Sequence, residues 1–180
     1  MKKLLGFSIF LVFVLIASLT AEAKVTLPAI FSDNMVLQQN TQVNVWGKAA
    51  PGEKVTVKAS WLDKAVTAKA AANGKWTVKL KTPKAITNQS VTVSGENEIT
   101  INNVLIGEVW LCTGQSNMEF PVSRHPDVKW NTGMLNEVEE LKDADYPEIR
   151  LFHVKHQLAH EGELDDCEGE WLVCNPKNLY

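Results

Sequence analysis

The chain has 180 residues, of which 45% are hydrophobic and 22% are charged, and its formal net charge at pH 7 is −3. These values are typical of an ordinary globular protein of one or two domains, and they argue against a disordered chain. The sequence has no concentrated basic patch interleaved with aromatic residues, so a nucleic-acid partner is not expected.

Residues 1–23 have the three parts of a secretory signal peptide. Lys2 and Lys3 precede an apolar run over residues 4–19, and Ala21-Glu22-Ala23 forms a small-x-small cleavage site. The apolar run is short for a spanning helix, and no second run of this kind follows it, so we do not expect stable membrane insertion. We expect export, cleavage near Ala23 and a mature protein that is periplasmic or secreted.

Residues 24–105 are predicted to form an antiparallel β-sandwich. Apolar and polar residues alternate from Val55 to Ala59 and again from Trp76 to Leu80, which is the period of strands with one buried face. Asn73-Gly74 predicts a two-residue hairpin in which both residues have positive φ, and Pro51-Gly52 predicts another turn.

The charge distribution predicts a domain boundary near residue 105. Residues 24–105 contain ten lysines and five acidic residues, whereas residues 106–180 contain six basic and fifteen acidic residues. The two segments therefore have net charges of +5 and −9. A shift of this size is typical of a change of domain.

Residues 106–180 have the pattern of one β-α-β unit. Apolar residues from Val109 to Cys112 form an uninterrupted run, as in a strand buried on both faces. Helical spacing then relates Met134, Leu135, Val138 and Leu141, and residues 149–154 again resemble a strand. A unit of this kind takes about 30 or more residues, so we expect about two parallel strands and an incomplete α/β domain.

Ser116 is the candidate nucleophile. It follows the apolar run in a turn that contains Gly114, where the backbone N–H groups of a following helix could stabilise an oxyanion. The alternative is that this serine only caps a helix after a glycine turn. His125, nine residues further along, is not expected to be its base.

Two blocks of sequence resemble bacterial sialate O-acetylesterases, an SGNH-hydrolase-like family of carbohydrate esterases. The first block contains Leu27-Pro28-x-Ile30-Phe31-Ser32-Asp33-x-Met35-Val36-Leu37-Gln38, then Val45-Trp46-Gly47 and Pro51-Gly52-Glu53. The second block is Ile106-Gly107-Glu108-Val109-Trp110-Leu111-Cys112-x-Gly114-Gln115-Ser116-Asn117-Met118-Glu119. Two blocks in this order, spread over about half of the chain, are more specific than a single short motif.

The resemblance implies a β-sandwich followed by the N-terminal part of an SGNH-like α/β domain. Ser116 would be the catalytic nucleophile, and Gly114, Gln115 and Asn117 would support its turn. The implied reaction is hydrolysis of O-acetyl esters of sialic acid or a related carbohydrate through an acyl-serine, without a metal or an organic cofactor. The family's Asp-x-x-His pair does not occur in the sequence, so we expect an N-terminal fragment that is inactive by itself.

Two other functions stay open at this point. One is an acetylxylan esterase, because the pocket that selects the sugar is expected to lie mostly outside this sequence. The other is a non-catalytic carbohydrate-binding or structural β-module. Trp46, Trp61 and Trp76 could form a sugar-stacking platform in such a module, although tryptophans on strands more often serve in packing.

The histidines and cysteines of the C-terminal segment each have two interpretations. His153, His156 and His160 would share a face if the segment were helical and could then bind a metal, but solvated side chains are the simpler interpretation. Cys167 and Cys174 form a plausible disulfide pair in an oxidising compartment, with two free thiols as the alternative.

Overall fold

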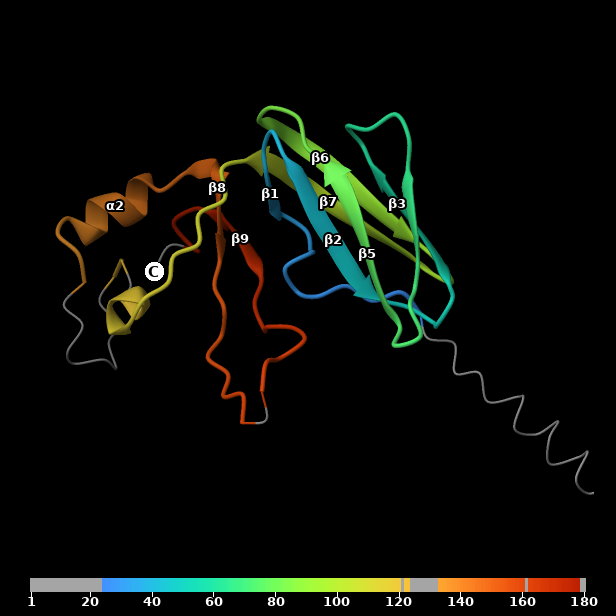
Figure 1. Ribbon diagram of the computed structural model, residues 1–180. Helices are drawn as coiled ribbons and strands as arrows, with labels where there is room; N and C mark the ends of the chain where they lie inside the picture. The colour runs from blue at the N-terminus through green and yellow to red at the C-terminus, as the bar shows by residue number, and fades with distance from the viewer. Residues whose placement is uncertain (1–23, 121, 124–132, 161, 179–180) are drawn as a thin grey trace, which may run out of the picture.

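The structure is a computed structural model that describes residues 24–120, 122–123, 133–160 and 162–178. The expected signal peptide over residues 1–23 and the histidine at position 125 lie outside these ranges. The described chain is mostly β-strand with few helices (Figure 1). Among the helices described, none combines the length and the apolar character that a membrane span requires.

Seven strands between residues 36 and 107 form two sheets. A five-stranded sheet has the order β1-β7-β6-β3-β4, and β2 pairs with β5 in a two-stranded sheet (Figure 1). The strands are β1 (Val36–Gln38), β2 (Gln42–Lys48), β3 (Lys54–Ala59), β4 (Val66–Lys69), β5 (Lys75–Lys81), β6 (Ile86–Ser94) and β7 (Glu98–Gly107).

The two sheets share one hydrophobic core. In β5, Trp76, Val78 and Leu80 are buried while the residues between them are exposed, which confirms the predicted alternation. From the other sheet, β3 contributes Val55 and Val57 to the same cluster. Burial of one such aliphatic side chain is worth about 1.5–3 kcal/mol relative to leaving it exposed. This core is therefore the main stabilising feature of the β-rich segment.

The first strand departs from the expected antiparallel arrangement. β1 pairs with β7 in parallel, with Val36 opposite Leu105 and Gln38 opposite Gly107. β2 follows β1 in the chain but belongs to the other sheet, so β1 and β2 do not form a hairpin. β1 instead pairs with β7, the last strand of the segment, at the edge of the five-stranded sheet. β7 also continues to Gly107, across the expected boundary near residue 105. The division of the chain into domains stays a prediction.

The two predicted turns have different outcomes. The turn at Pro51-Gly52 is confirmed, with Gly52 at a φ of 81°. The two-residue hairpin at Asn73-Gly74 is wrong, because the amide of Gly74 donates to the carbonyl of Ala71 at 2.9 Å, which places Ala72 and Asn73 at the centre of the turn. In this register Gly74 follows the two central residues, and it has a positive φ of 76°, whereas Asn73 does not have positive φ. The strands it joins, β4 and β5, lie in different sheets.

The apolar run before Ser116 does not form the predicted strand. Val109, Trp110 and Leu111 have exposed fractions of 45%, 84% and 88%. A strand that is apolar on both faces needs neighbours and covering layers, and none of the described strands pairs with this run. The chain instead passes from β7 through an extended segment into the 3-10 helix η1 (Ser116–Glu119).

The rest of the described chain also differs from the predicted parallel β-α-β unit. The helix α2 (Glu137–Asp143) is followed by β8 (Tyr146–Phe152), which pairs with β9 (Trp171–Cys174) in antiparallel orientation. The rings of Phe152 and Trp171 lie 5.1 Å apart across this pair and help to fix it. The helical spacing was informative, because α2 does form, but Leu135 and Val138 of its apolar pattern are exposed.

The β8-β9 pair is attached to the N-terminal sheets. The indole Nε1–H of Trp171 donates to the carbonyl of Ile30 at 2.8 Å, and its ring packs against the shared core. The guanidinium of Arg150 donates to the side-chain oxygen of Asn103, which lies in β7, at 3.3 Å. These contacts hold β8 and β9 beside β1 and β7 (Figure 1).

Candidate active site around Ser116

Ser116 begins η1 and is exposed to solvent. The amide of Met118 donates to the carbonyl of Gln115 at 2.9 Å, and the amide of Phe120 donates to the carbonyl of Asn117 at 3.3 Å. A single tight turn therefore holds the serine. The turn expected directly after Ser116 is present, although the strand expected before it is not.

Gly114 allows the chain to approach this turn closely. A Cβ atom at position 114 would lie 3.3 Å from Cγ of Met118, which is tighter than ordinary van der Waals contact. The φ of Gly114 does not lie in the left-handed region, so glycine is favoured here by space and not by backbone conformation. Gln115 and Asn117 are exposed on either side of Ser116, and their supporting role stays a prediction.

The segment that leads to Ser116 is anchored at its start by β1. The side-chain oxygen of Gln38 accepts a hydrogen bond from the amide of Val109 at 2.8 Å. The carboxylate of Glu108 accepts from the Gln38 amide at 3.0 Å and from the Gln39 amide at 2.7 Å. These two donors lower the pKa of Glu108, the Gln38 hydrogen bond being the larger cause. The serine segment is therefore fixed to the N-terminal strands at Glu108 and Val109.

Sequence reasoning missed this anchor, which we call the Gln38-Glu108 clamp. Gln38 belongs to the first of the two sequence blocks that resemble one family, and Glu108 belongs to the second. The parallel pairing of β1 with β7 brings Gln38, which ends the first run of the first block, beside the start of the second block. A three-residue strand such as β1 has too short a pattern to predict its partner, so the residues were visible in the sequence but their contact was not.

A general base does not contact Ser116 in the described part of the chain. Within those ranges, no hydrogen bond joins its hydroxyl to a histidine or a carboxylate, and His153, His156 and His160 follow β8 in another segment. The described residues supply an exposed serine in a tight turn, fixed at its base, but without the proton acceptor that would activate it.

Neither a metal site nor a disulfide is present in the described ranges. The metal-binding interpretation of the three histidines requires a helix, and residues 153–160 contain none. No group of three His, Cys, Asp or Glu side chains among the described residues is placed to hold a metal ion. Cys112, Cys167 and Cys174 are free thiols in the structure, so the plausible bridge is not formed.

The three tryptophans of the β-rich segment do not form a common platform. Trp76 is buried in the core with an exposed fraction of 3%. Trp61 is partly buried against that core, and its Nε1–H donates to the carbonyl of Lys81 at 2.9 Å. Trp46 lies on the outer face of β2 with an exposed fraction of 41%. Packing accounts for Trp61 and Trp76 but not for the exposed ring of Trp46.

Comparisons with known proteins connect this arrangement to esterases. No established protein-family profile matches the chain. The chain is 31% identical over 150 residues to a sialate O-acetylesterase from Mus musculus, an alignment that covers 77% of the chain and 26% of the relative. It is 30% identical over 165 residues to the sialate O-acetylesterase from Rattus norvegicus, covering 84% of the chain and 29% of the relative.

A solved structure supports the same connection. A carbohydrate acetylesterase from Xanthomonas citri matches with a TM-score of 0.75 and 30% identity, over 86% of the chain and 34% of that protein. The chain therefore spans less than a third of the length of the curated relatives that it matches.

Proposed function

We propose, for a chain that belongs to the sialate O-acetylesterase-like family, that Ser116 is the nucleophile of an esterase acting on O-acetylated sugars. The observation that carries the proposal is the position of Ser116. It is an exposed serine at the start of a tight turn, on a segment fixed at Glu108 and Val109 by Gln38. A helix-capping role alone would not account for this anchoring together with the relationship to acetylesterases.

The proposed reaction has two steps. The Ser116 Oγ attacks the acetyl carbonyl carbon while a general base takes its proton, and the C–O bond to the sugar then breaks as the sugar oxygen receives that proton. The acetyl-serine is hydrolysed by water, which releases acetate and restores the hydroxyl. A backbone N–H beside the nucleophile, such as that of Asn117, is the usual type of donor to the oxyanion. The scheme uses no metal and no organic cofactor.

The substrate is proposed to be an acetyl ester of sialic acid or a related carbohydrate. The curated relatives are named for sialate, whereas the solved relative is described more broadly as a carbohydrate acetylesterase. Acetylxylan therefore belongs in the substrate panel as the alternative within the esterases. A solely binding or structural role for the chain is the alternative outside them.

The organisation of the protein is proposed along the same lines. The shared core between the two sheets supports a β-sandwich domain over residues 24–105. The sequence block around Ser116, which resembles SGNH-like esterases, supports residues 106–180 as the N-terminal part of an SGNH-like α/β domain. The basic, apolar and small-x-small parts of residues 1–23 support export to the periplasm or medium.

A chimaera tests the nucleophile without requiring activity from the chain by itself. Residues 24–178 would replace the matching part of the Xanthomonas citri acetylesterase, with which they share 30% identity. Acetate release would be followed from O-acetylated sialic acid and from acetylxylan, with Ser116→Ala and the matched control Ser94→Ala. We expect turnover that the first variant loses and the second retains. Turnover that persists in Ser116→Ala would remove Ser116 from the mechanism.

A further inference from the structure

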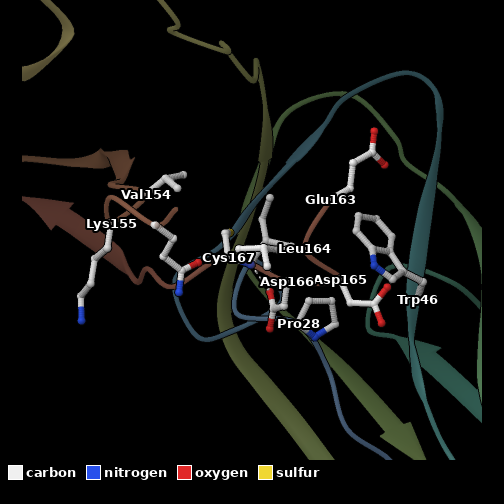
Figure 2. Close-up of a pocket in the computed structure, with 11 residues that line it drawn as sticks. Pro28, Trp46, Val154, Lys155, Glu163, Leu164, Asp165, Asp166 and Cys167 are labelled. Atoms are coloured by element: carbon white, nitrogen blue, oxygen red, sulfur yellow. Dashed lines mark hydrogen bonds between the residues drawn. The ribbon is translucent and has the colours of Figure 1, made fainter. Parts of the chain in front are cut away.

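A hollow of about 480 Å³ lies between the N-terminal strands and the loop that joins β8 to β9 (Figure 2). Pro28, Ile30 and Trp46 line it from one side, and the loop lines it from the other with Val154, Lys155, Gln157 and residues 163–167. Its volume lies within the ~300–1,000 Å³ of small-molecule sites. No residue of the turn around Ser116 lines it, so it is separate from the candidate active site.

Trp46 presents a fixed aromatic surface to this hollow. Its ring meets the ring of Phe31 edge to face, with centroids 4.6 Å apart and an interplanar angle of 81°. This contact holds the indole in one orientation while 41% of the residue remains exposed. An aromatic ring held in this way loses little conformational entropy when a ligand stacks on it.

The loop opposite Trp46 is also held in place. The carboxylate of Asp165 accepts hydrogen bonds from Lys48 at 2.9 Å and from Lys75 at 2.7 Å. The carboxylate of Asp166 accepts from the amide of Ala29 at 3.1 Å. Both walls of the hollow are therefore joined by direct contacts between the acidic loop and the basic N-terminal strands.

The polar groups on the loop complement the aromatic ring. Figure 2 shows the Trp46 ring and the carboxylates of Glu163 and Asp165 around the same hollow, and Gln157 adds a side-chain amide to its lining. An aromatic face stacks on the C–H face of a sugar ring, while carboxylates and amides hydrogen-bond to its hydroxyl groups. The combination of a fixed indole with such acceptors and donors matches a saccharide better than a purely apolar ligand.

The charges of the lining restrict the class of saccharide. Glu163, Asp165 and Asp166 contribute three carboxylates, against one ammonium group from Lys155. Lys48 and Lys75, which pair with Asp165, bring the ammonium groups to three and balance the carboxylates. The hollow therefore has no excess positive charge that would favour an anionic sugar. We propose that this hollow is a second, non-catalytic site that binds an uncharged glycan, with Trp46 as the stacking surface and Glu163 as a hydroxyl acceptor.

Titration of the isotope-labelled chain by NMR tests this site without any enzymatic readout. The probes are the neutral oligosaccharides xylohexaose and cellohexaose, the anionic 3′-sialyllactose and a short oligolysine peptide. We expect saturable shifts of the Trp46 indole N–H and the amides of residues 163–167 with a neutral probe. Trp46→Ala should weaken this binding at least about tenfold, whereas Trp110→Ala, which removes another exposed indole, should leave it unchanged.

Several results would overturn the proposal. They are the absence of a saturable shift with both neutral probes, equal affinity in Trp46→Ala, and tighter binding of sialyllactose or oligolysine than of either neutral probe. If Trp46→Ala loses the amide pattern of the folded sheets, Glu163→Ala decides instead, and unchanged affinity in that variant would count against the site. Because Ser116 takes no part in binding here, the outcome is independent of the proposed esterase function.

Discussion

A single exposed side chain carries the proposed chemistry. In the chimaera, Ser116→Ala should lower kcat by about 10³- to 10⁶-fold, because removal of a nucleophile leaves only binding and oxyanion stabilisation. Its midpoint of unfolding should change little, since substitutions at exposed positions usually cost within about 0.5 kcal/mol. Acetate release and urea unfolding measured on the same preparation check both parts. A large loss of stability would mean that the serine has a structural role instead.

Leu80 is the opposite case, a residue whose role is packing. It is fully buried in the shared core, whereas the neighbouring Lys79 lies on the exposed face of β5. Leu80→Ala should lower the free energy of unfolding by about 2–5 kcal/mol through lost burial and the cavity left behind. Lys79→Ala should stay within about 0.5 kcal/mol. Similar values for the two variants in urea denaturation would contradict the assignment of the core.

At the scale of elements, the Gln38-Glu108 clamp connects β1 to the serine segment. Gln38→Ala removes the acceptor of the Val109 amide and one donor to Glu108. Each such hydrogen bond contributes about 0.5–1.5 kcal/mol, so hydrogen exchange of the Val109 amide should accelerate several-fold. Gln42→Ala, at the exposed start of β2, is the matched control. Unchanged exchange at Val109 would show that the clamp does not hold the segment.

The contact between the acidic loop and β2 and β5 predicts a dependence on pH. Hydrogen bonds from Lys75 and Lys48 lower the pKa of Asp165 from 3.8 to about 2. A carboxyl group whose pKa is lower in the folded state stabilises the fold above its unfolded pKa and loses that contribution as the pH falls through its folded pKa. Wild type should therefore exceed Asp165→Asn in stability at neutral pH, and the difference should shrink as the pH falls from 3.8 towards about 2.

Denaturation at low ionic strength is the suitable measurement, because the ion pairs of Asp165 with Lys48 and Lys75 are exposed and salt screens them. Asp63→Asn serves as the control, since this exposed aspartate forms no ion pair within the described ranges. A difference between wild type and Asp165→Asn that is as large at pH 2 as at neutral pH, or that also appears with the control, would contradict the role of Asp165.

The elements also show what the sequence could and could not predict. The alternation of apolar and polar residues was sufficient to predict β3 and β5, because a strand with one buried face has a period of two in its sequence. The buried strand predicted for the run from Val109 to Leu111 was wrong. An apolar run indicates side chains that favour burial, but it does not identify the elements that would cover them. Parallel pairing of β1 with β7 depends on contacts between distant residues, which local pattern does not contain.

The candidate site follows the same division. Ser116 could be proposed as a candidate because a local motif and a family resemblance both mark it, and the turn around it depends on local sequence. The clamp at Glu108 was not found, because it depends on the register between two strands about 70 residues apart.

At the scale of the whole molecule, the described chain places no base next to the proposed nucleophile. Residues 24–180 by themselves should therefore release acetate from O-acetylated sugars only at the background rate, because an unassisted serine hydroxyl is a weak nucleophile near neutral pH. The comparison is with the same preparation carrying Ser116→Ala. Turnover by the chain that depends on Ser116 would show that one of its own histidines serves as the base.

The central claim is that the acetyl group passes through Ser116. Rapid quenching of the chimaera during turnover of an activated acetyl ester, followed by peptide mass spectrometry, tests it most directly. We predict one acetyl group on the peptide that contains Ser116, present in wild type and in Ser94→Ala and absent from Ser116→Ala. An acetyl group on another residue, or turnover that continues in Ser116→Ala, would contradict the assignment of Ser116 as the nucleophile.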